Sequence, residues 1–192
     1  MKIYNSALTG FHNKIDFKEK VTSFTHDLGF GFVHDVVEGI PGSYKLCDAL
    51  YFENFWNNGH KTLKVKYSFA DLQNCINNAV NTYEGKVYLV TGKSVLKHFT
   101  GYNMISPIML HNYESVLLQW NSEMQFKSTQ SNYDVISKVV SENDRIGDIM
   151  CGYGNTVMEC LKQNKKFICS DISPECISIT NQQIKNHERE FK

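Results

Sequence analysis

The sequence has no long apolar run and little proline, and both absences limit what kind of protein it encodes. None of its 192 residues belongs to a run that approaches the length of a membrane helix, about 18 apolar residues. The opening stretch MKIYNSALTG also lacks the apolar core of a signal peptide. With 3 prolines and 42% hydrophobic residues, we expect a folded globular domain and not a disordered segment.

An excess of charge and the common metal-binding spacings are absent too. The 20 basic and 20 acidic residues cancel, which argues against a protein that holds nucleic acid by bulk electrostatics, although a local basic face can exist. The six cysteines include no Cys-x-x-Cys, which favours buried, reduced thiols in a cytoplasmic protein over disulfides. The seven histidines show no His-Glu-x-x-His spacing, and we assign no metal.

What the chain does have is an alternation of apolar runs and segments of helical period. After a polar stretch over 121–132, we predict a helix over 133–140, a strand over 148–151, a glycine turn leading into a helix, a strand over 166–172, and a closing helix that begins with Ser173 and Pro174. This order is typical of a parallel sheet with helices on its faces.

The first part of the chain fits the same α/β class. We predict strands over 31–39, 44–52, 86–92 and 114–120, and a helix over 68–85. We treat residues 1–192 as a single domain, with residues 1–30 as an N-terminal extension.

The stretch GDIMCGYGNTVMEC, residues 147–160, bends the chain between a strand and a helix. Gly152 and Gly154 permit a tight turn and a close approach of the backbone to a ligand. The helix that follows offers unpaired N–H groups. Val157 occupies the third glycine position of the dinucleotide fingerprint, so that fingerprint is incomplete. A purely structural turn remains the alternative for this stretch.

An acid follows this turn at a suggestive distance. The next strand ends in Asp171, 19 residues after Gly152. An acid at this point can accept hydrogen bonds from two ribose hydroxyls, although it can also cap the helix at Ser173. Turn and acid together indicate an adenosine-type ligand. The missing third glycine disfavours a pyrophosphate and leaves room for S-adenosylmethionine (SAM).

Residues 143–179 resemble the SAM-binding region of the amino-group DNA methyltransferases, which modify adenine N6 or cytosine N4. That region reads Asp-Pro-Phe-x-Gly-x-Gly-Thr-Thr, then a helix, an aromatic strand, an acid and a Pro-Glu helix. The residues that match it are Asp148, Gly152, Gly154, Thr156, the strand Lys166-Phe167-Ile168, Asp171 and Pro174-Glu175. The residues that depart from it are Ile149, Met150 and Asn155.

This resemblance implies a fold and a cofactor site. The fold is a Rossmann-like, SAM-dependent methyltransferase fold with a mostly parallel central sheet, helices on both faces and a circularly permuted order, because the glycine turn comes late in the chain. The cofactor is S-adenosyl-L-methionine. The residues implied around it are Asp148, Met150, Gly152, Gly154, Thr156, Asp171 and Ile172.

The family also carries an Asp-Pro-Pro-Tyr tetrapeptide at the end of the strand beside the turn. The best match is DALY, residues 48–51, in which both prolines are replaced. The resemblance implies that Asp48 accepts a hydrogen bond from an exocyclic amine and that Tyr51 stacks on a flipped base. An ordinary strand end with Asp48 as a turn residue is the alternative. TQSN, residues 129–132, occupies the position of the family's Thr-Gln-Lys-Pro.

The implied function is methyl transfer from SAM to an amino group of a DNA base, with adenine N6 preferred to cytosine N4 and with RNA as a second possible substrate. The 40 residues over 93–132 leave no room for a large recognition domain, so a protein partner or a homodimer is expected to supply target recognition. Basic clusters at 60–66 and 162–166 are candidate phosphate contacts. Two other functions stay open: a catalytically inactive methyltransferase-like subunit, and a lyase or hydrolase that degrades SAM.

Overall fold

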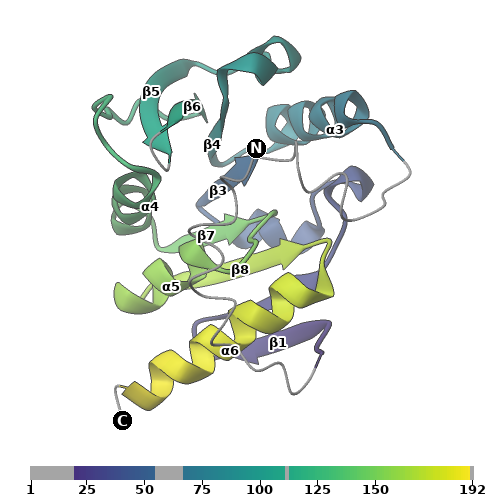
Figure 1. Ribbon diagram of the computed structural model, residues 1–192, viewed down its shortest axis with the longest axis vertical. Helices are drawn as coiled ribbons and strands as arrows, with labels where there is room; N and C mark the ends of the chain where they lie inside the picture. The colour runs from purple at the N-terminus through teal and green to yellow at the C-terminus, as the bar shows by residue number, and fades with distance from the viewer. Residues whose placement is uncertain (1–19, 55–66, 111–112, 191–192) are drawn as a thin grey trace.

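The centre of the molecule is an eight-stranded sheet (Figure 1), seen in a computed structural model that describes residues 20–54, 67–110 and 113–190. Its strands are β1 (Ser23–His26), β2 (Gly29–Val33), β3 (Ala49–Asn54), β4 (Lys86–Gly92), β5 (Met104–Leu110), β6 (Tyr113–Trp120), β7 (Arg145–Asp148) and β8 (Lys166–Asp171). Their order across the sheet is β1-β2-β8-β7-β3-β4-β6-β5. The neighbours β2, β8, β7, β3 and β4 are parallel, whereas β1, β6 and β5 are joined by antiparallel pairing.

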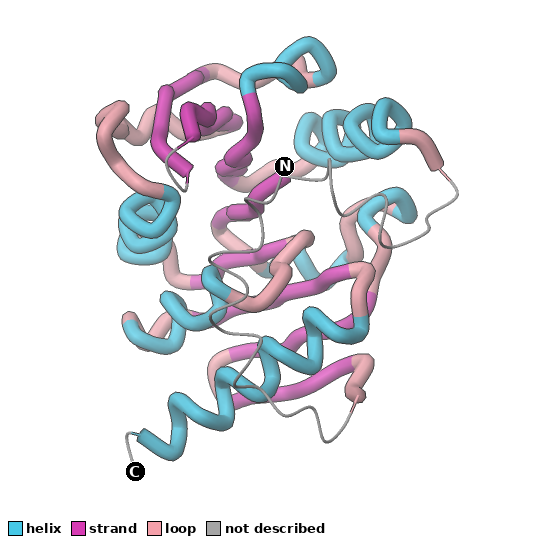
Figure 2. Tube along the Cα trace, in the orientation of Figure 1, coloured by secondary structure: helices cyan, strands magenta, loops and turns pink. Residues whose placement is uncertain are grey.

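Helices cover both faces of this sheet, as predicted (Figure 2). The helices are α3 (Phe69–Thr82), α4 (Asn132–Ser141), α5 (Asn155–Lys162) and α6 (Pro174–Glu190), with short 3-10 helices η1 (Val36–Glu38), η2 (Gly42–Leu46) and η3 (Lys93–His98). Buried side chains of α4, α5 and α6 form one core with the sheet, and those of α3 and the 3-10 helices form the other. The permuted α/β class is confirmed, because the late β7–α5–β8–α6 segment lies beside the early strand β3.

Two helix starts are fixed by local sequence. Ser68 accepts a hydrogen bond from the backbone N–H of Asp71, whose side chain accepts one from the backbone of Ser68 in return. Ser131 and Asp134 form the same reciprocal capping box at the start of α4. A box of this kind satisfies two backbone donors that a helix end leaves unpaired. The chain therefore enters α3 and α4 at defined residues.

The central strand β3 is buried on both faces. Ala49 and Tyr51 pack into the core with α4, α5 and α6, whereas Leu50 and Phe52 pack into the core with α3. Parallel strands covered on both sides carry continuous apolar runs without alternation. The sequence ALYF therefore identifies a buried strand but does not say where that strand begins and ends.

Several predicted boundaries are corrected by the structure. The predicted strand over 148–151 is wrong, because β7 is Arg145–Asp148 and Asp148 ends it. The predicted strand over 44–52 is wrong in its first half, because η2 precedes β3. The predicted strand over 31–39 is β2, which ends at Val33. Strand β5, at the sheet edge, had not been predicted.

The N-terminal part of the described chain belongs to the sheet. Strands β1 and β2 form a hairpin, and β2 pairs in parallel with β8. We had assigned part of this hairpin to an N-terminal extension, whose residues 1–19 lie outside the described ones. Within the described ranges, no helix has the length and apolar character needed to cross a membrane.

Candidate functional site

The candidate site lies where the parallel strands end. The carboxyl ends of parallel strands meet at one edge of a sheet, and ligands of α/β proteins bind outside that edge. Here the edge is formed by Asp171 at the end of β8, Asp148 at the end of β7, and Glu53 with Asn54 at the end of β3. The loop after Asp148 is the predicted glycine turn. Acidic and polar side chains are thus concentrated at this edge.

The two glycines of the turn do different things. Both have positive φ, +51° at Gly152 and +85° at Gly154, which side-chain-bearing residues rarely adopt. Among the described residues, a Cβ added to Gly152 would meet nothing within 4 Å, so that part of the structure leaves space beside this residue. A Cβ added to Gly154 would lie 2.7 Å from the side chain of Thr180 in α6. Gly152 therefore leaves room for a ligand, whereas Gly154 lets α5 and α6 approach each other.

Asp171 closes the turn from the neighbouring strand. Its Oδ2 accepts a hydrogen bond from the backbone N–H of Gly152 at 2.9 Å, and its Oδ1 accepts one from Ser173 at 2.9 Å. The thiol of Cys176 also bonds to this carboxyl group. A carboxylate has about four lone-pair directions, so one further donor can be accepted directly, and a second would replace the weak thiol donor. Removal of the Asp171 carboxyl group from water raises its pKa, and the hydrogen bonds from the backbone of Ser173 and Gly152 oppose that rise. The structure therefore brings the predicted acid into direct contact with the predicted turn.

Asp148 lies inside the turn and is 4% exposed. Its Oδ1 accepts a hydrogen bond from the backbone N–H of Met150 at 3.1 Å, and Thr156 in α5 also bonds to the carboxyl group. Burial raises the pKa of Asp148 to about 7, and the nearby carboxylates Glu53 and Asp171 add to the rise. Asp148 therefore shapes the turn from within.

This buried carboxyl group makes a pH-dependent contribution to stability. The pKa of Asp148 is about 7 in the folded chain against 3.8 ordinarily, so raising the pH between those values favours the unfolded chain. At about 1.4 kcal/mol per unit, the loss reaches roughly 4 kcal/mol and is complete above pH 7. We expect Asp148→Asn to gain about 2–3 kcal/mol of unfolding free energy relative to the wild type between pH 5 and pH 8. Urea unfolding at pH 5 and at pH 8 measures this difference. If the free energies of unfolding of the variant and the wild type differ by the same amount at both pH values, the raised pKa of Asp148 is contradicted.

The matched control for this measurement is Asp144→Asn. Asp144 precedes β7, is exposed, and forms an ion pair with Lys165. Because the carboxyl group of Asp144 lies at the surface and not inside the turn, we expect this substitution to leave the pH dependence of unfolding close to that of the wild type.

Tyr44 holds the ends of β7 and β8 from the other face of the sheet, and the sequence had not pointed to it. Its side chain is fully buried. Its hydroxyl lies 3.0 Å from the carbonyl oxygen of Asp148 and 2.8 Å from Oγ of Ser170. Burial raises the pKa of Tyr44 well above its ordinary value, so the hydroxyl remains a donor. Met150 and Ile172 are half-buried and pack against the same core.

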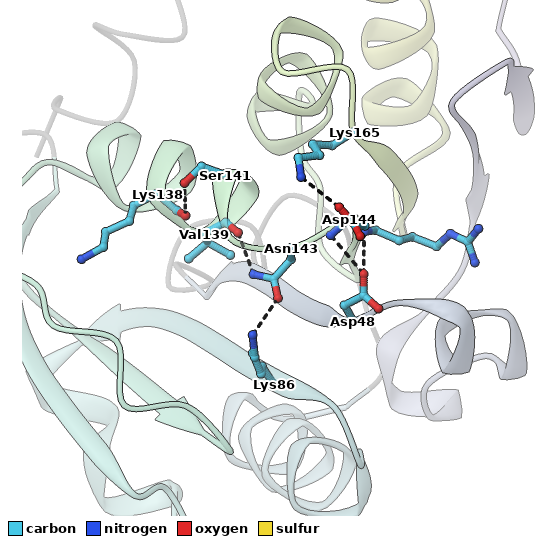
Figure 3. Close-up of polar contacts among 9 residues, drawn as sticks. Asp48, Lys86, Lys138, Val139, Ser141, Asn143, Asp144 and Lys165 are labelled. Carbon is cyan, nitrogen blue, oxygen red and sulfur yellow. Dashed lines mark hydrogen bonds and ion pairs between the residues drawn. The ribbon is translucent and has the colours of Figure 1, made fainter.

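The structure places Asp48 at the amino edge of the sheet, where the parallel strands begin, and not at the carboxyl edge (Figure 3). Asp48 comes before β3, so the prediction that it lies at the end of this strand is wrong. Its Oδ2 accepts hydrogen bonds from the backbone N–H groups of Asp144 at 3.1 Å and Arg145 at 2.8 Å. It lines an open polar cleft of about 430 Å³ with Lys86 and other polar residues. Asp48 therefore anchors the start of β7.

This position predicts a structural effect and no catalytic one. Asp48→Ala removes an acceptor for two exposed backbone donors, and we expect a loss of about 1 kcal/mol in the free energy of unfolding. Affinity for any ligand at the carboxyl edge should stay within twofold of the wild type. Denaturant unfolding and calorimetry measure the two quantities, and loss of ligand binding without loss of stability would return Asp48 to the site.

Tyr51 does not offer a stacking surface. Its side chain is 1% exposed and belongs to the core shared with α4, α5 and α6. Its hydroxyl donates a hydrogen bond to Oε1 of Glu53 at 2.9 Å. The predicted stacking of Tyr51 on a base is therefore incompatible with its burial. What Tyr51 contacts is Glu53, the last residue but one of β3.

Glu53 is the side chain at the site that sequence reasoning missed. Continuing the register of β3 with β7, in which Leu50 pairs with Gly147, places Glu53 beyond Asp148, beside the glycine turn. Asn132 at the start of α4 donates a hydrogen bond to Oε1 of Glu53 at 2.8 Å. The signal was present in the sequence, since the apolar run ALYF stops at Glu53 and Asn54.

Comparisons with known proteins place this arrangement among solved structures. A scan of protein-family models and a search of curated protein sequences give no match. M1.HpyAVI, solved in complex with SAM, superposes with a TM-score of 0.53 and 13% identity over 80% of this chain and 98% of its own. TTHA0409 from Thermus thermophilus, solved with S-adenosyl-L-methionine, gives 0.57 and 12% over 84% and 94%. The cytosine-N4-specific PvuII DNA methyltransferase gives 0.56 and 12% over 86% and 89%.

The chain has the fold of these solved structures, one of which is a DNA methyltransferase. The resemblance found in residues 143–179 is thus confirmed for the architecture as a whole. Two of the methyltransferase-fold structures were solved with SAM. In the described part of this chain, the methyltransferase fold contains no group of three His, Cys, Asp or Glu side chains arranged to hold a metal ion.

Proposed function

We propose that this chain is a SAM-dependent methyltransferase that acts on an exocyclic amino group of a DNA base. The observation that carries the proposal is the meeting of three features at one sheet edge: the open Gly152 turn, the Asp171 carboxylate bonded to it, and Glu53 beside it. The same fold is seen in proteins solved with SAM and in a DNA amino-methyltransferase.

The residues of the turn fit an adenosyl ligand. Gly152 leaves room for a ligand among the described residues, and Asp171 can accept from two ribose hydroxyls once one of them replaces the weak thiol donor of Cys176. Met150 and Ile172, each half-buried beside the turn, supply apolar surface for the adenine ring. Asp148 and Thr156 hold the turn in shape, and Gly154 allows α5 to start directly after it.

We assign the contact with the substrate amine to Glu53. When bound, SAM supplies a methyl group that is already electrophilic and needs no metal. A base amine is a weak nucleophile because its lone pair is delocalised into the ring. A carboxylate that accepts a hydrogen bond from the amine orients its nitrogen. It can also receive the proton that the nitrogen releases as the nitrogen–carbon bond forms and the bond from that carbon to the sulfonium sulfur breaks, which leaves a neutral thioether. Glu53 occupies the end of β3, where a carboxylate faces the turn.

The assignment to a DNA base rests on the fold, which is that of a solved DNA methyltransferase, whereas the segment between β4 and α4 is too short for a large recognition domain. Residues 93–131 of this segment contain η3, β5, β6 and a connecting loop. We therefore propose that a protein partner or a second copy of the chain supplies target recognition.

Adenine N6 is our preferred acceptor, and cytosine N4, the target of the PvuII enzyme, is the other. The basic cluster at 60–66 lies outside the described residues.

The test is transfer of labelled methyl groups from SAM to unmethylated DNA of mixed sequence, followed by mass spectrometry of the digested nucleosides. We expect N6-methyladenine, and N4-methylcytosine would move the assignment to the other amine. Intact SAM binding without transfer to DNA or RNA would reject the proposal. Loss of SAM in the absence of any acceptor would point instead to a degrading enzyme.

One observation favours a second function, that of an inactive subunit which retains the cofactor site. The four residues that end β3 and follow it read Glu53-Asn54-Phe55-Trp56, with no proline and with Glu in place of Asp. If the chain is such a subunit, calorimetry would detect SAM binding, and transfer would require a partner chain that brings its own catalytic residues.

A further inference from the structure

The carboxylate of Glu53 is held from two sides. The hydroxyl of Tyr51 donates to its Oε1 at 2.9 Å, and the side-chain amide of Asn132 donates to the same atom at 2.8 Å. We propose that Tyr51 and Asn132 are positioning residues that fix Glu53 as the acceptor for the substrate amine. This inference rests on the proposed function. The family's Asp-Pro-Pro-Tyr tetrapeptide has two prolines, which restrict the backbone at the end of the strand. In this chain, which lacks them, Tyr51 and Asn132 would fix the side chain instead.

Asn132 comes from a part of the chain far from Glu53 and is itself firmly placed. It is the first residue of α4 and is 1% exposed. The residue before it, Ser131, forms the capping box with Asp134 and bridges to Met109 of β5. A donor mounted on a capped helix start has little freedom to move. The Asn132 amide is thus a fixed point against which Glu53 rests.

Tyr51 supplies the second fixed donor. It shares the face of β3 with Glu53, two residues along the strand, and its ring is buried in the core. Burial, followed by the proximity of Glu53, raises the pKa of Tyr51 well above its ordinary value. The phenol therefore keeps its proton and remains a donor over the working pH range.

The residue after Glu53 is fixed in a similar way from the opposite face of the sheet. The side-chain amide of Asn54 donates to the buried Gln73 of α3, and its backbone carbonyl accepts from the hydroxyl of Thr91 at 3.4 Å. Prolines stiffen a loop by fixing backbone angles. Here α4 holds Glu53 and α3 holds Asn54 by side-chain hydrogen bonds. The end of β3 is thus rigid without proline.

The test uses Asn132→Leu, which keeps the volume and removes the donor. We expect kcat for methyl transfer to unmethylated DNA to fall about 10- to 100-fold, because a carboxylate that is free to rotate seldom meets the amine in line. The KM for DNA and the Kd for SAM should stay within about twofold, since neither ligand touches Asn132 in this proposal. Tyr51→Phe, which keeps the ring, should lower kcat in the same manner.

The matched control is Asn143→Leu. Asn143 is a buried asparagine just beyond the other end of α4, bonded to the Val139 carbonyl and to Lys86 (Figure 3). This variant should lose a similar amount of melting temperature and keep its kcat. If Asn143→Leu lowers kcat as much as Asn132→Leu does, the effect is general loosening and the inference is overturned.

The remaining outcomes separate this inference from the function beneath it. If the wild-type chain binds SAM but transfers no methyl group, both the proposed function and the positioning roles are overturned. An active wild type that Glu53→Gln inactivates, combined with unchanged kcat in both Asn132→Leu and Tyr51→Phe, leaves the proposed function standing and overturns the positioning roles. Should Asn132→Leu fail to fold, Tyr51→Phe decides alone.

Discussion

Replacing Glu53 by glutamine should lower methyl transfer to DNA about 1000-fold. Glutamine has the same shape and can still accept the hydrogen bonds of Tyr51 and Asn132 through its carbonyl oxygen. It loses the negative charge, however, and cannot take up the proton that the amine releases. The Kd for SAM should stay within about twofold, because Gly152 and Asp171 are unchanged. Single-turnover transfer with labelled SAM measures the loss, and calorimetry measures the affinity.

The matched control for this substitution is Glu142→Gln. Glu142 is exposed and lines the polar cleft at the amino edge of the sheet, so the same chemical change occurs at the opposite end of the strands. Its kcat should equal that of the wild type. Full activity in Glu53→Gln would mean that another group faces the amine and that β3 does not carry the catalytic contact.

The last third of the chain was readable from sequence because its signals are local. The turn at Gly152, the acid at Asp171 and the Ser173-Pro174 helix start follow one another within 23 residues, from 152 to 174, and each depends on backbone chemistry near its own position. The same holds for the start of α4 at Ser131. The structure brings the turn and the acid together as this part of the sequence predicts.

The start and end of β3 were misread for a physical reason. A strand buried on both faces has no alternating pattern, so ALYF could not show that Asp48 lies before the strand and Glu53 at its end. A short match to Asp-x-x-Tyr then decided the assignment. In a parallel sheet, residues at the start and at the end of a strand lie at opposite edges of the sheet. Asp48 therefore bonds to the start of β7, whereas Glu53 lies at the carboxyl edge beside the glycine turn.

Contacts between distant segments could not be predicted from the sequence at all. Asn132 and Glu53 are 79 residues apart, and Tyr44 and Asp148 are 104 apart. Local sequence preferences do not predict that the start of α4 contacts the end of β3, or that Tyr44 of η2 contacts the end of β7. These two contacts nevertheless determine the shape of the candidate site. The sequence therefore predicted the glycine turn and its neighbouring acid better than the polar end of β3.

Asp171→Ala should weaken SAM binding at least about 100-fold. The carboxylate offers charge-assisted hydrogen bonds to the ribose hydroxyls, each contributing about 1.5–3 kcal/mol, and about 1.4 kcal/mol corresponds to a tenfold change in Kd. Alanine also removes the acceptor for the backbone N–H groups of Gly152 and Ser173, so part of the loss can come from a relaxed turn. Calorimetry with SAM gives the total effect.

Thr180→Val separates the two contributions to that loss. The hydroxyl of Thr180 donates to the carbonyl oxygen of Gly152 at 3.3 Å, and its side chain packs against Gly154. Valine keeps this packing and removes the hydrogen bond, so it perturbs the turn and leaves the carboxylate in place. We expect its Kd for SAM to rise less than about threefold, since a neutral hydrogen bond contributes about 0.5–1.5 kcal/mol to stability and the ligand does not meet it. Equal losses in both variants would mean that Asp171 acts only by shaping the turn, and unchanged affinity in Asp171→Ala would remove the adenosyl ligand from this edge of the sheet.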